Sequence, residues 1–232
     1  HRDLHSFPTR RSSDLRPPGR LRFQPETARA VALELVAEAG GEVLLGSFVQ
    51  GALVESGRVV GVELATKSGV VPVRAGVVVD CTADADVAAS AGVPFRQGDP
   101  TDGRIQVCNF RWSMGGVDRE AFARAALPPE ELGGLFAEAV RSGEIRPPEA
   151  LFAQPAETFP FAGAERGLVM GNWELQGIDP TDAFQVSRAL AQCQLAALQI
   201  VRFCRRRLPG YGSCRIERFP TTLGTRDRKS VV

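Results

Sequence analysis

The chain has 232 residues, of which 44% are hydrophobic, and its 28 basic and 27 acidic residues nearly cancel. A balanced charge argues against nucleic acid or a membrane surface as partner, and no apolar run approaches the roughly 20 residues of a membrane span. The composition therefore predicts a soluble, cytoplasmic globular chain with one sizeable core.

The two ends of the chain share an unusual relation at the level of DNA. Residues 9–15 (TRRSSDL) and 227–232 (DRKSVV) can be encoded by one DNA word and its reverse complement, and this word resembles a sequencing adapter. The alternative is coincidence between two short peptides. We therefore expect residues 1–15 and 227–232 to be non-native tails and the remainder to be an internal fragment of a longer protein.

Histidine and cysteine usage excludes several kinds of chemistry. Both histidines, His1 and His5, lie in the first expected tail, so the remainder has no Ser-His-Asp triad, His-ligated metal or His general base. The five cysteines are odd in number and show no C-x-x-C spacing. This pattern predicts reduced thiols, no dithiol redox centre and no metal site.

The first elements in chain order are a helix and an antiparallel meander. Residues 25–39 have Pro at a first helical position, apolar residues at helical spacing and a Gly-Gly stop, which predicts a helix packed on a neighbour. The apolar residues 42–45 predict a short strand. Three more strands, separated by turns that contain Ser and Gly, are predicted at residues 48–55, 59–65 and 70–74.

A continuously apolar run at residues 76–80 predicts a strand covered on both faces in a parallel sheet. A polar turn at residues 81–86 and a helix at residues 87–91 follow it. The next elements, read from alternation and helical spacing, are strands at residues 105–114 and 168–175 and helices at residues 118–126 and 128–142.

The longest predicted helix begins at Pro180 and ends at Leu208. Asp179 is its expected N-cap, and Asp182 stands at the capping-box position. Apolar residues recur along one face for roughly 28 residues, about 42 Å. The four arginines at its end complement the helix dipole and are read as structural: Arg202, Arg205, Arg206 and Arg207.

The polar turn after the apolar run is the most informative segment. A buried parallel strand that ends in small and acidic residues places amides and carboxylates where open α/β sheets bind nucleotides. Residues 75–95 (AGVVVDCTADADVAASAGVPF) resemble the D-A-T-G-D-A-D-x-A segment of FAD-dependent oxidoreductases of the glutathione-reductase-like class. The resemblance implies that Thr82 and Ala83 lie close to FAD and that Asp84 reaches its ribose or ribityl hydroxyls, with Asp86 also on the cofactor-binding pattern.

Two positions in this turn depart from the family pattern. Cys81 replaces Ala, which is tolerable because a free Cys behaves as a small hydrophobe. Ala83 replaces Gly, and a Cβ there restricts positive φ and the close approach of a cofactor. The alternative for the acidic residues is that Asp84 and Asp86 simply cap the short helix.

A second resemblance lies at residues 219–226 (FPTTLGTR), which are similar to the L-G-x-R-E-S-R-R motif where the family's chain returns to the flavin. Gly224, Thr225 and Arg226 fall on this pattern. The resemblance implies that Gly224 lets backbone N–H groups approach the flavin, and that Arg226 is the candidate catalytic residue, stabilising negative charge on a reduced flavin or a substrate carboxylate.

Two further assignments keep their alternatives. By resemblance the backbone of Phe48 or Val49 pairs with adenine, whereas a plain meander residue explains either equally well. Arg111 lies beside Trp112 in the expected substrate domain and could bind an anionic substrate, whereas a solvated strand arginine is the simpler interpretation.

The resemblance implies an α/β fold: a partial glutathione-reductase-like FAD-binding domain that lacks its first βαβ unit, with an inserted β-meander and an α+β substrate domain. The expected divisions are residues 16–100 for the FAD-binding part with the meander, 101–176 for the substrate domain, and 177–226 for the long helix and the return. No G-x-G-x-x-G turn, which holds the pyrophosphate in such enzymes, is present. We therefore expect weak or no FAD binding and no activity from this chain by itself.

The predicted function is that of part of an FAD-dependent oxidoreductase that passes hydride or electrons between a small organic substrate and the flavin. One alternative is a non-catalytic α/β binding or scaffold module. Another is a protein that binds NAD(P) in place of FAD.

Overall fold

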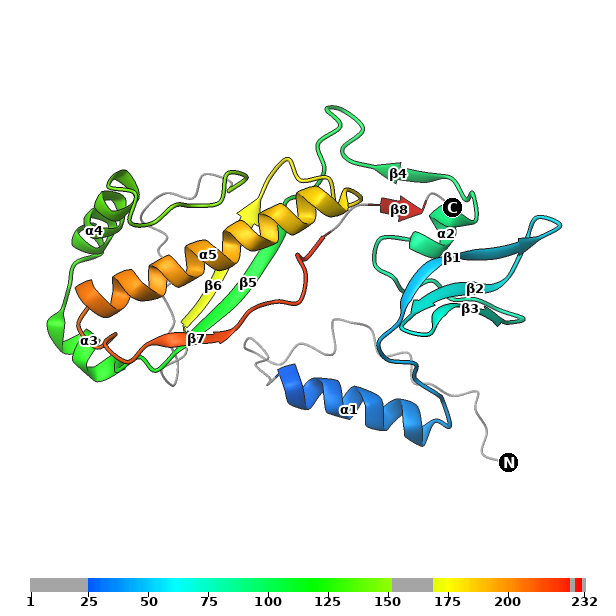
Figure 1. Ribbon diagram of the computed structural model, residues 1–232, viewed down its shortest axis with the longest axis horizontal. Helices are drawn as coiled ribbons and strands as arrows, with labels where there is room; N and C mark the ends of the chain where they lie inside the picture. Colours follow the sequence, from blue (N-terminus) through cyan, green and yellow to red (C-terminus); the bar gives the residue numbers. More distant parts are fainter. Residues whose placement is uncertain (1–24, 152–168, 226–227, 231–232) are drawn as a thin grey trace, which may run out of the picture. The chain divides into compact units, whose positions relative to one another are not determined.

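The computed structural model describes residues 25–151, 169–225 and 228–230, which divide into two compact units (Figure 1). The first unit contains residues 25–48 and 65–69. Its helix α1 (Pro25–Glu38) forms at the predicted position. The apolar side chains expected to pack on a neighbour are exposed, however, and Leu35 keeps 60% of its surface.

The predicted meander is confirmed as a three-stranded sheet. Strands β1 (Phe48–Glu55), β2 (Arg58–Thr66) and β3 (Gly69–Arg74) lie in the order β1-β2-β3. Ser56 and Gly57 have φ of 51° and 74°, as the two-residue turn between twisted strands requires. A Cβ on Gly61 would lie 2.2 Å from the carbonyl oxygen of Val73, so only glycine permits this strand spacing.

Two predicted strands are wrong. Residues 42–45 and 76–80 join no ladder, and Val77 and Val79 expose 81% and 77% of their surface. A strand is stabilised only when a neighbour accepts and donates its backbone hydrogen bonds. None of the described strands pairs with either segment, so their apolar character does not make them sheet members.

A second three-stranded sheet, called the core sheet below, has the order β6-β5-β7. Its strands are β5 (Cys108–Gly115), β6 (Val169–Leu175) and β7 (Arg215–Arg218), and both pairings are antiparallel. The predictions for β5 and β6 are confirmed with small shifts of their first residues. β7 was not predicted, because its four residues offer one apolar side chain among charges.

One long helix, α5 (Ala183–Arg207), lies across the core sheet (Figure 1). It has 25 residues and begins later than predicted. Asp182 is the N-cap and accepts hydrogen bonds from the backbone N–H groups of Phe184 and Gln185 at 2.9 and 3.1 Å. Asp179 instead accepts from the N–H of Thr181 at 2.9 Å, closing a turn that precedes the helix.

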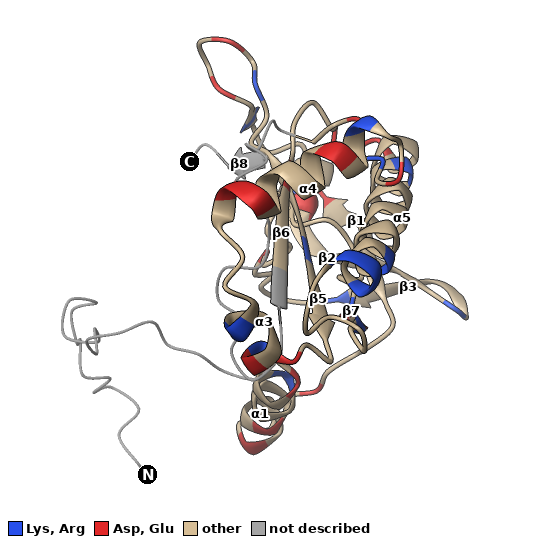
Figure 2. Ribbon diagram, turned by 90° about the vertical axis from the view of Figure 1, so that its left-hand side faces the viewer, with Lys and Arg blue, Asp and Glu red and all other residues tan. Residues whose placement is uncertain are grey.

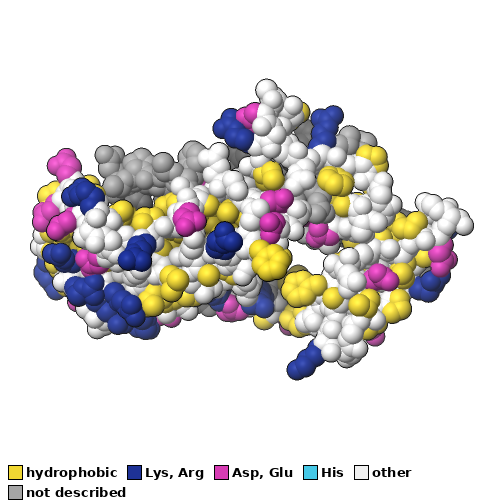
Figure 3. All heavy atoms as spheres, turned by 45° about the horizontal axis from the view of Figure 1, so that its top comes forward, with side chains coloured by type: hydrophobic (Ala, Val, Ile, Leu, Met, Phe, Trp, Pro, Cys, Tyr) yellow, Lys and Arg dark blue, Asp and Glu magenta, His cyan; other side chains and the backbone are white. Residues whose placement is uncertain are grey.

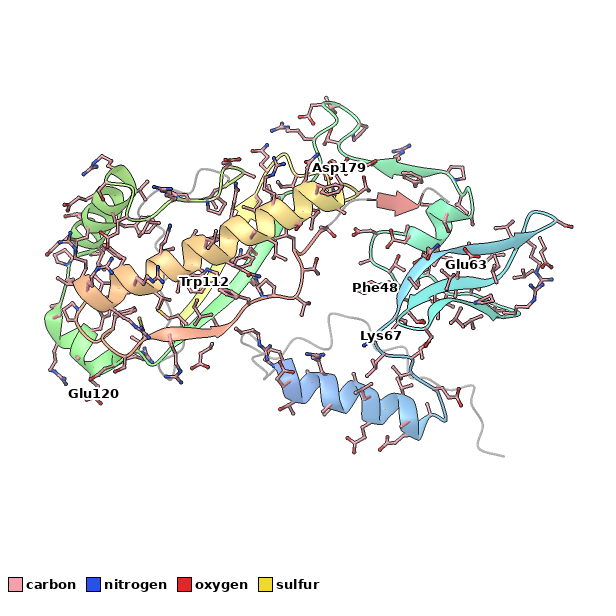
Figure 4. The ribbon with its side chains drawn as sticks, in the orientation of Figure 1. Phe48, Glu63, Lys67, Trp112, Glu120 and Asp179 are labelled. Atoms are coloured by element: carbon pink, nitrogen blue, oxygen red, sulfur yellow. The ribbon has the colours of Figure 1, made fainter. Side chains whose placement is uncertain are left out.

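The main hydrophobic core fills the space between α5 and the core sheet. Phe110 stacks on Trp173 with ring centroids 5.6 Å apart, and Trp112 lies beneath α5 (Figure 4). A Cβ on Gly171 would lie 2.2 Å from Trp112 Nε1, so this glycine makes room for the indole. The predicted apolar stripe of α5 is confirmed by its buried members: Cys193, Ala197, Val201, Cys204 and Leu208.

The two shorter helices between β5 and β6 are α3 (Arg119–Ala125) and α4 (Pro129–Arg141), both close to their predicted positions. Asp118 caps α3 by accepting from the N–H of Ala121 at 2.9 Å. Within the described ranges, no helix combines the length and apolar character that a membrane crossing requires.

The C-terminal end of α5 is rich in arginine: its ribbon is blue in Figure 2, and blue side chains gather at this end of the molecule in Figure 3. Arg206 forms an ion pair with Glu144, and Arg205 Nε donates to the carbonyl oxygen of Cys214 at 2.7 Å. Cations at a helix C-terminus also complement its dipole. These contacts agree with the structural role predicted for the cluster.

Candidate functional site

The candidate site begins at residues 80–86, called the acidic loop below, which lead into helix α2 (Asp86–Ser90). Asp80 Oδ1 accepts from the N–H and the hydroxyl of Thr82 at 3.0 and 2.7 Å, and its Oδ2 accepts from the N–H of Ala88 at 2.9 Å. The hydroxyl oxygen of Thr82 accepts from the N–H of Asp86 at 2.8 Å. Asp80 and Thr82 therefore hold the shape of the loop.

The charge of Asp80 is stabilised by this network. Partial burial by itself raises the pKa of a carboxyl, but the hydrogen bonds from Thr82 and Ala88 together outweigh it and hold the pKa of Asp80 below its ordinary value. Asp80 is thus a carboxylate at neutral pH, and its acceptor atoms are occupied by the chain itself.

The backbone of the acidic loop keeps the conformation that glycine favours, although alanines stand there. Ala83 and Ala85 have φ of 72° and 55°. A left-handed conformation costs an L-residue about 1 kcal/mol or more. The replacement of Gly by Ala at position 83 has therefore not removed the backbone turn; it has added a Cβ and strain to it.

The return segment, residues 223–225, forms hydrogen bonds with two parts of the chain that are distant in the sequence. Leu223 is buried in the main core at 2% exposure. Gly224 then exchanges two backbone hydrogen bonds with Asn109 on β5, at 2.9 and 2.8 Å. The hydroxyl of Thr225 donates to Asp84 Oδ2 at 2.7 Å. The two segments singled out by resemblance therefore meet, although 141 positions separate Thr225 from Asp84.

The next described segment after Thr225 is a short strand. Strand β8 (Arg228–Ser230) pairs antiparallel with β4 (Phe95–Gln97), which follows α2. Arg226, the predicted catalytic residue, lies outside the described residues. Residues 228–230 belong to the expected non-native tail, and that expectation stays a prediction.

Val49, one of the two residues predicted to pair with adenine, lies on a different element from the acidic loop. Val49 is half-buried at the start of β1, a strand linked to α2 by the hydrogen bond from Ala52 N–H to Ser90 Oγ at 2.8 Å. Asn109, which positions Gly224, was missed, since an Asn in an alternating strand carries no signal of its backbone partner.

Several kinds of chemistry find no support in the part of the chain that the structure describes. It contains no group of three or more His, Cys, Asp or Glu placed to hold a metal ion. All five cysteines are free thiols, and only Cys81 is exposed. Burial raises the pKa of Cys193 to about 12, so that thiol stays protonated and unreactive at neutral pH.

Comparison with protein families identifies the chain. The model of the family described as FAD dependent oxidoreductase matches residues 3–232. The chain belongs to this family. Its cofactor is accordingly FAD, and its function is flavin-linked redox chemistry. No curated protein sequence and no solved structure matches the chain.

Proposed function

We propose that the acidic loop and the return segment together form the flavin-contacting part of an oxidoreductase of the glutathione-reductase-like class, acting on a small organic substrate. The observation that carries the proposal is the hydrogen bond from Thr225 to Asp84 at 2.7 Å. It joins, at one place, the two segments that resemble flavin-contacting motifs.

The acidic loop suits the sugar part of the cofactor better than its phosphates. Asp84 is half-buried and its carboxylate accepts from a hydroxyl donor, Thr225. Ribose and ribityl hydroxyls are donors of the same kind. The neighbouring Asp80 and Asp86 add negative charge, which disfavours a diphosphate at this point.

Gly224 is explained by a ligand better than by the fold. It is exposed, its φ is not left-handed, and a Cβ built on it would make ordinary contacts with Asn109 at 3.6 Å. Nothing among the described residues therefore requires glycine at this position. A close approach of the flavin ring supplies a reason for it.

FAD, when bound, supplies the hydride or electron transfer itself. The chain's own residues bind and orient it: Asp84 accepts from its hydroxyls, and Asp80 and Thr82 hold the loop in shape. Arg226 follows Thr225 in the sequence and remains the proposed source of positive charge for a reduced flavin or a substrate carboxylate.

The proposed division of the chain follows from the same assignment. Residues 16–100 and 177–226 contain both flavin-contacting segments, and residues 101–176 contain β5 and β6 of the core sheet. Strands β5 and β6 are then the substrate-binding part, and the third strand of the core sheet, β7, comes from residues 177–226. Helix α5 packs on this sheet and carries the chain back toward the return segment.

Titration of the purified chain with FAD, followed by quenching of flavin fluorescence, tests the proposal. Because the chain lacks a G-x-G-x-x-G turn, we expect weak but saturable binding. It should weaken further by at least about fivefold in Gly224→Ala, whose added Cβ obstructs the flavin, and by at least about tenfold in Asp84→Ala, which loses an acceptor for a cofactor hydroxyl. Gly212→Ala is the matched control, since Gly212 is exposed and a Cβ built on it would have nothing within 4 Å.

Three outcomes separate the candidate functions. FAD binding that depends on Asp84 and Gly224 supports the proposal. Tighter binding of NADPH than of FAD would favour the nicotinamide alternative. Binding of neither nucleotide, with Asp84→Ala lowering only the stability of the fold, would favour a scaffold in which Asp84 serves only to hold Thr225.

A further inference from the structure

The core sheet has two faces of opposite character. Side chains of β5 alternate, so that Phe110 and Trp112 enter the core while Asn109 and Arg111 lie on the other face. We call this second face the open face because Arg111 on it is exposed, although Ser113, two residues further along β5, is buried. The register with β6 adds two polar residues to it, because Arg111 lies opposite Asn172 and Asn109 lies opposite Glu174.

Arg111 stands near the middle of the open face and is exposed. Its Nε donates to Asn172 Oδ1 at 3.3 Å, which orients the guanidinium. Some exposed arginines pair with carboxylates, as Arg74 does with Glu55 and Arg215 with Glu217. Among the described residues no Asp or Glu forms an ion pair with Arg111.

The open face adjoins the candidate flavin site through the backbone. Asn109, two residues before Arg111 on β5, exchanges both of its backbone hydrogen bonds with Gly224. Two strand residues span roughly 7 Å. Arg111 therefore lies about one small-molecule length along the strand from the glycine that the proposed function assigns to the flavin.

The hydrogen-bond donors that remain on Arg111 favour a carboxylate as the bound group. With Nε occupied by Asn172, the two terminal amino groups of Arg111 remain for an end-on, two-point contact. A carboxylate matches this fork in geometry and in its single negative charge. A phosphate dianion suits it less, because Glu174 lies on the same face one residue pair away.

We propose that Arg111, positioned by Asn172, binds a carboxylate group of the substrate on the open face of the core sheet. That the bound molecule is the redox substrate rests on the proposed function; that a carboxylate binds there does not. Arg111 is the binding residue, and Asn172 acts through it.

The test is fluorine NMR of the full chain with 4-fluorobenzoate as probe and 4-fluorobenzamide as its neutral counterpart. We expect saturable binding of the benzoate only, weakened at least about tenfold in Arg111→Met because a charged hydrogen-bond donor is lost. Arg58→Met is the matched control: Arg58 is an exposed strand arginine that donates to the carbonyl oxygen of Gly76, and its loss should change the affinity less than twofold.

A second variant keeps the test independent of folding. Asn172→Asp preserves an acceptor for Arg111 Nε but adds a negative charge, so benzoate binding should fall at least about tenfold while the circular dichroism spectrum stays unchanged. Equal affinities of wild type and Arg111→Met, no benzoate binding by wild type, or stronger displacement by inorganic phosphate than by acetate would each overturn the inference.

The FAD titration separates this inference from the proposed function. An Arg111→Met chain that loses benzoate but keeps its FAD affinity supports the carboxylate site. Benzoate binding through Arg111 in a chain that does not bind FAD also supports the site, and contradicts only the assignment of the flavin-contacting residues.

Discussion

The core sheet and the acidic loop are held in shape by different forces. Trp112 is 1% exposed among apolar neighbours, whereas Val77, just before the loop, is 81% exposed. The loop depends instead on the acceptor atoms of Asp80 and on alanines in a left-handed conformation. The core sheet is therefore stabilised by packing and the acidic loop by hydrogen bonds. Substitutions in the two regions should change the free energy of unfolding by different amounts.

The largest expected contrast is between two apolar side chains. Trp112→Ala should lower the free energy of unfolding by about 3–5 kcal/mol, because a buried aromatic ring is removed and a cavity is left. Val77→Ala should change it by less than about 0.5 kcal/mol, as at other exposed positions. Urea denaturation followed by far-ultraviolet circular dichroism measures both.

This comparison can also fail in an informative way. A loss of more than about 1 kcal/mol in Val77→Ala would mean that residues 76–80 are covered in solution. The sequence-based prediction of a buried strand at residues 76–80 would then be correct.

A pair of glycines sharpens the packing side of the comparison. Gly171→Ala should cost about 1–3 kcal/mol, because its Cβ would lie 2.2 Å from Trp112 Nε1 and force the indole to move. Gly134→Ala, in an open position of α4, should instead stabilise by roughly 0.5–1 kcal/mol through helix propensity. Thermal unfolding of the two variants should shift in opposite directions, and shifts of the same sign would refute the packing argument.

The smallest effect concerns backbone strain in the acidic loop. Ala83→Gly should stabilise the chain by about 0.5–1 kcal/mol, because glycine adopts φ of 72° without a Cβ penalty. Ala121→Gly, inside α3, should destabilise it by about 1 kcal/mol. Chemical denaturation resolves the two signs; a loss of stability in Ala83→Gly would show that the loop is not strained.

Sequence patterns predicted two kinds of element. The first kind pairs with neighbours that are close in the sequence, and the second has apolar residues at helical spacing over many turns. The meander follows from its turns, and α5 from its apolar stripe. The start of α5 was misplaced because Asp179 and Asp182 are both good caps, and only the turn closed by Asp179 decides between them. Residues 76–80 failed because an apolar run does not reveal whether a neighbouring strand exists.

The resemblance predicted which two segments come together, but not the contacts that hold them in place. Asp84 and Thr225 were found through resemblance, and the structure joins them. The contribution of Asp80 to the loop and of Asn109 to the return segment was not foreseen. Each acts on backbone groups of residues that the sequence does not mark as partners, so no pattern of residue types encodes it.

The attachment of Gly224 to Asn109 has a consequence for how such a protein can diverge. Both hydrogen bonds join main-chain atoms, so any residue except proline at position 109 can keep them. The side chain at position 109 takes no part in these two bonds, and it lies on the same face of the sheet as Arg111. Mutation can therefore vary this side chain while the backbone attachment of the return segment is kept.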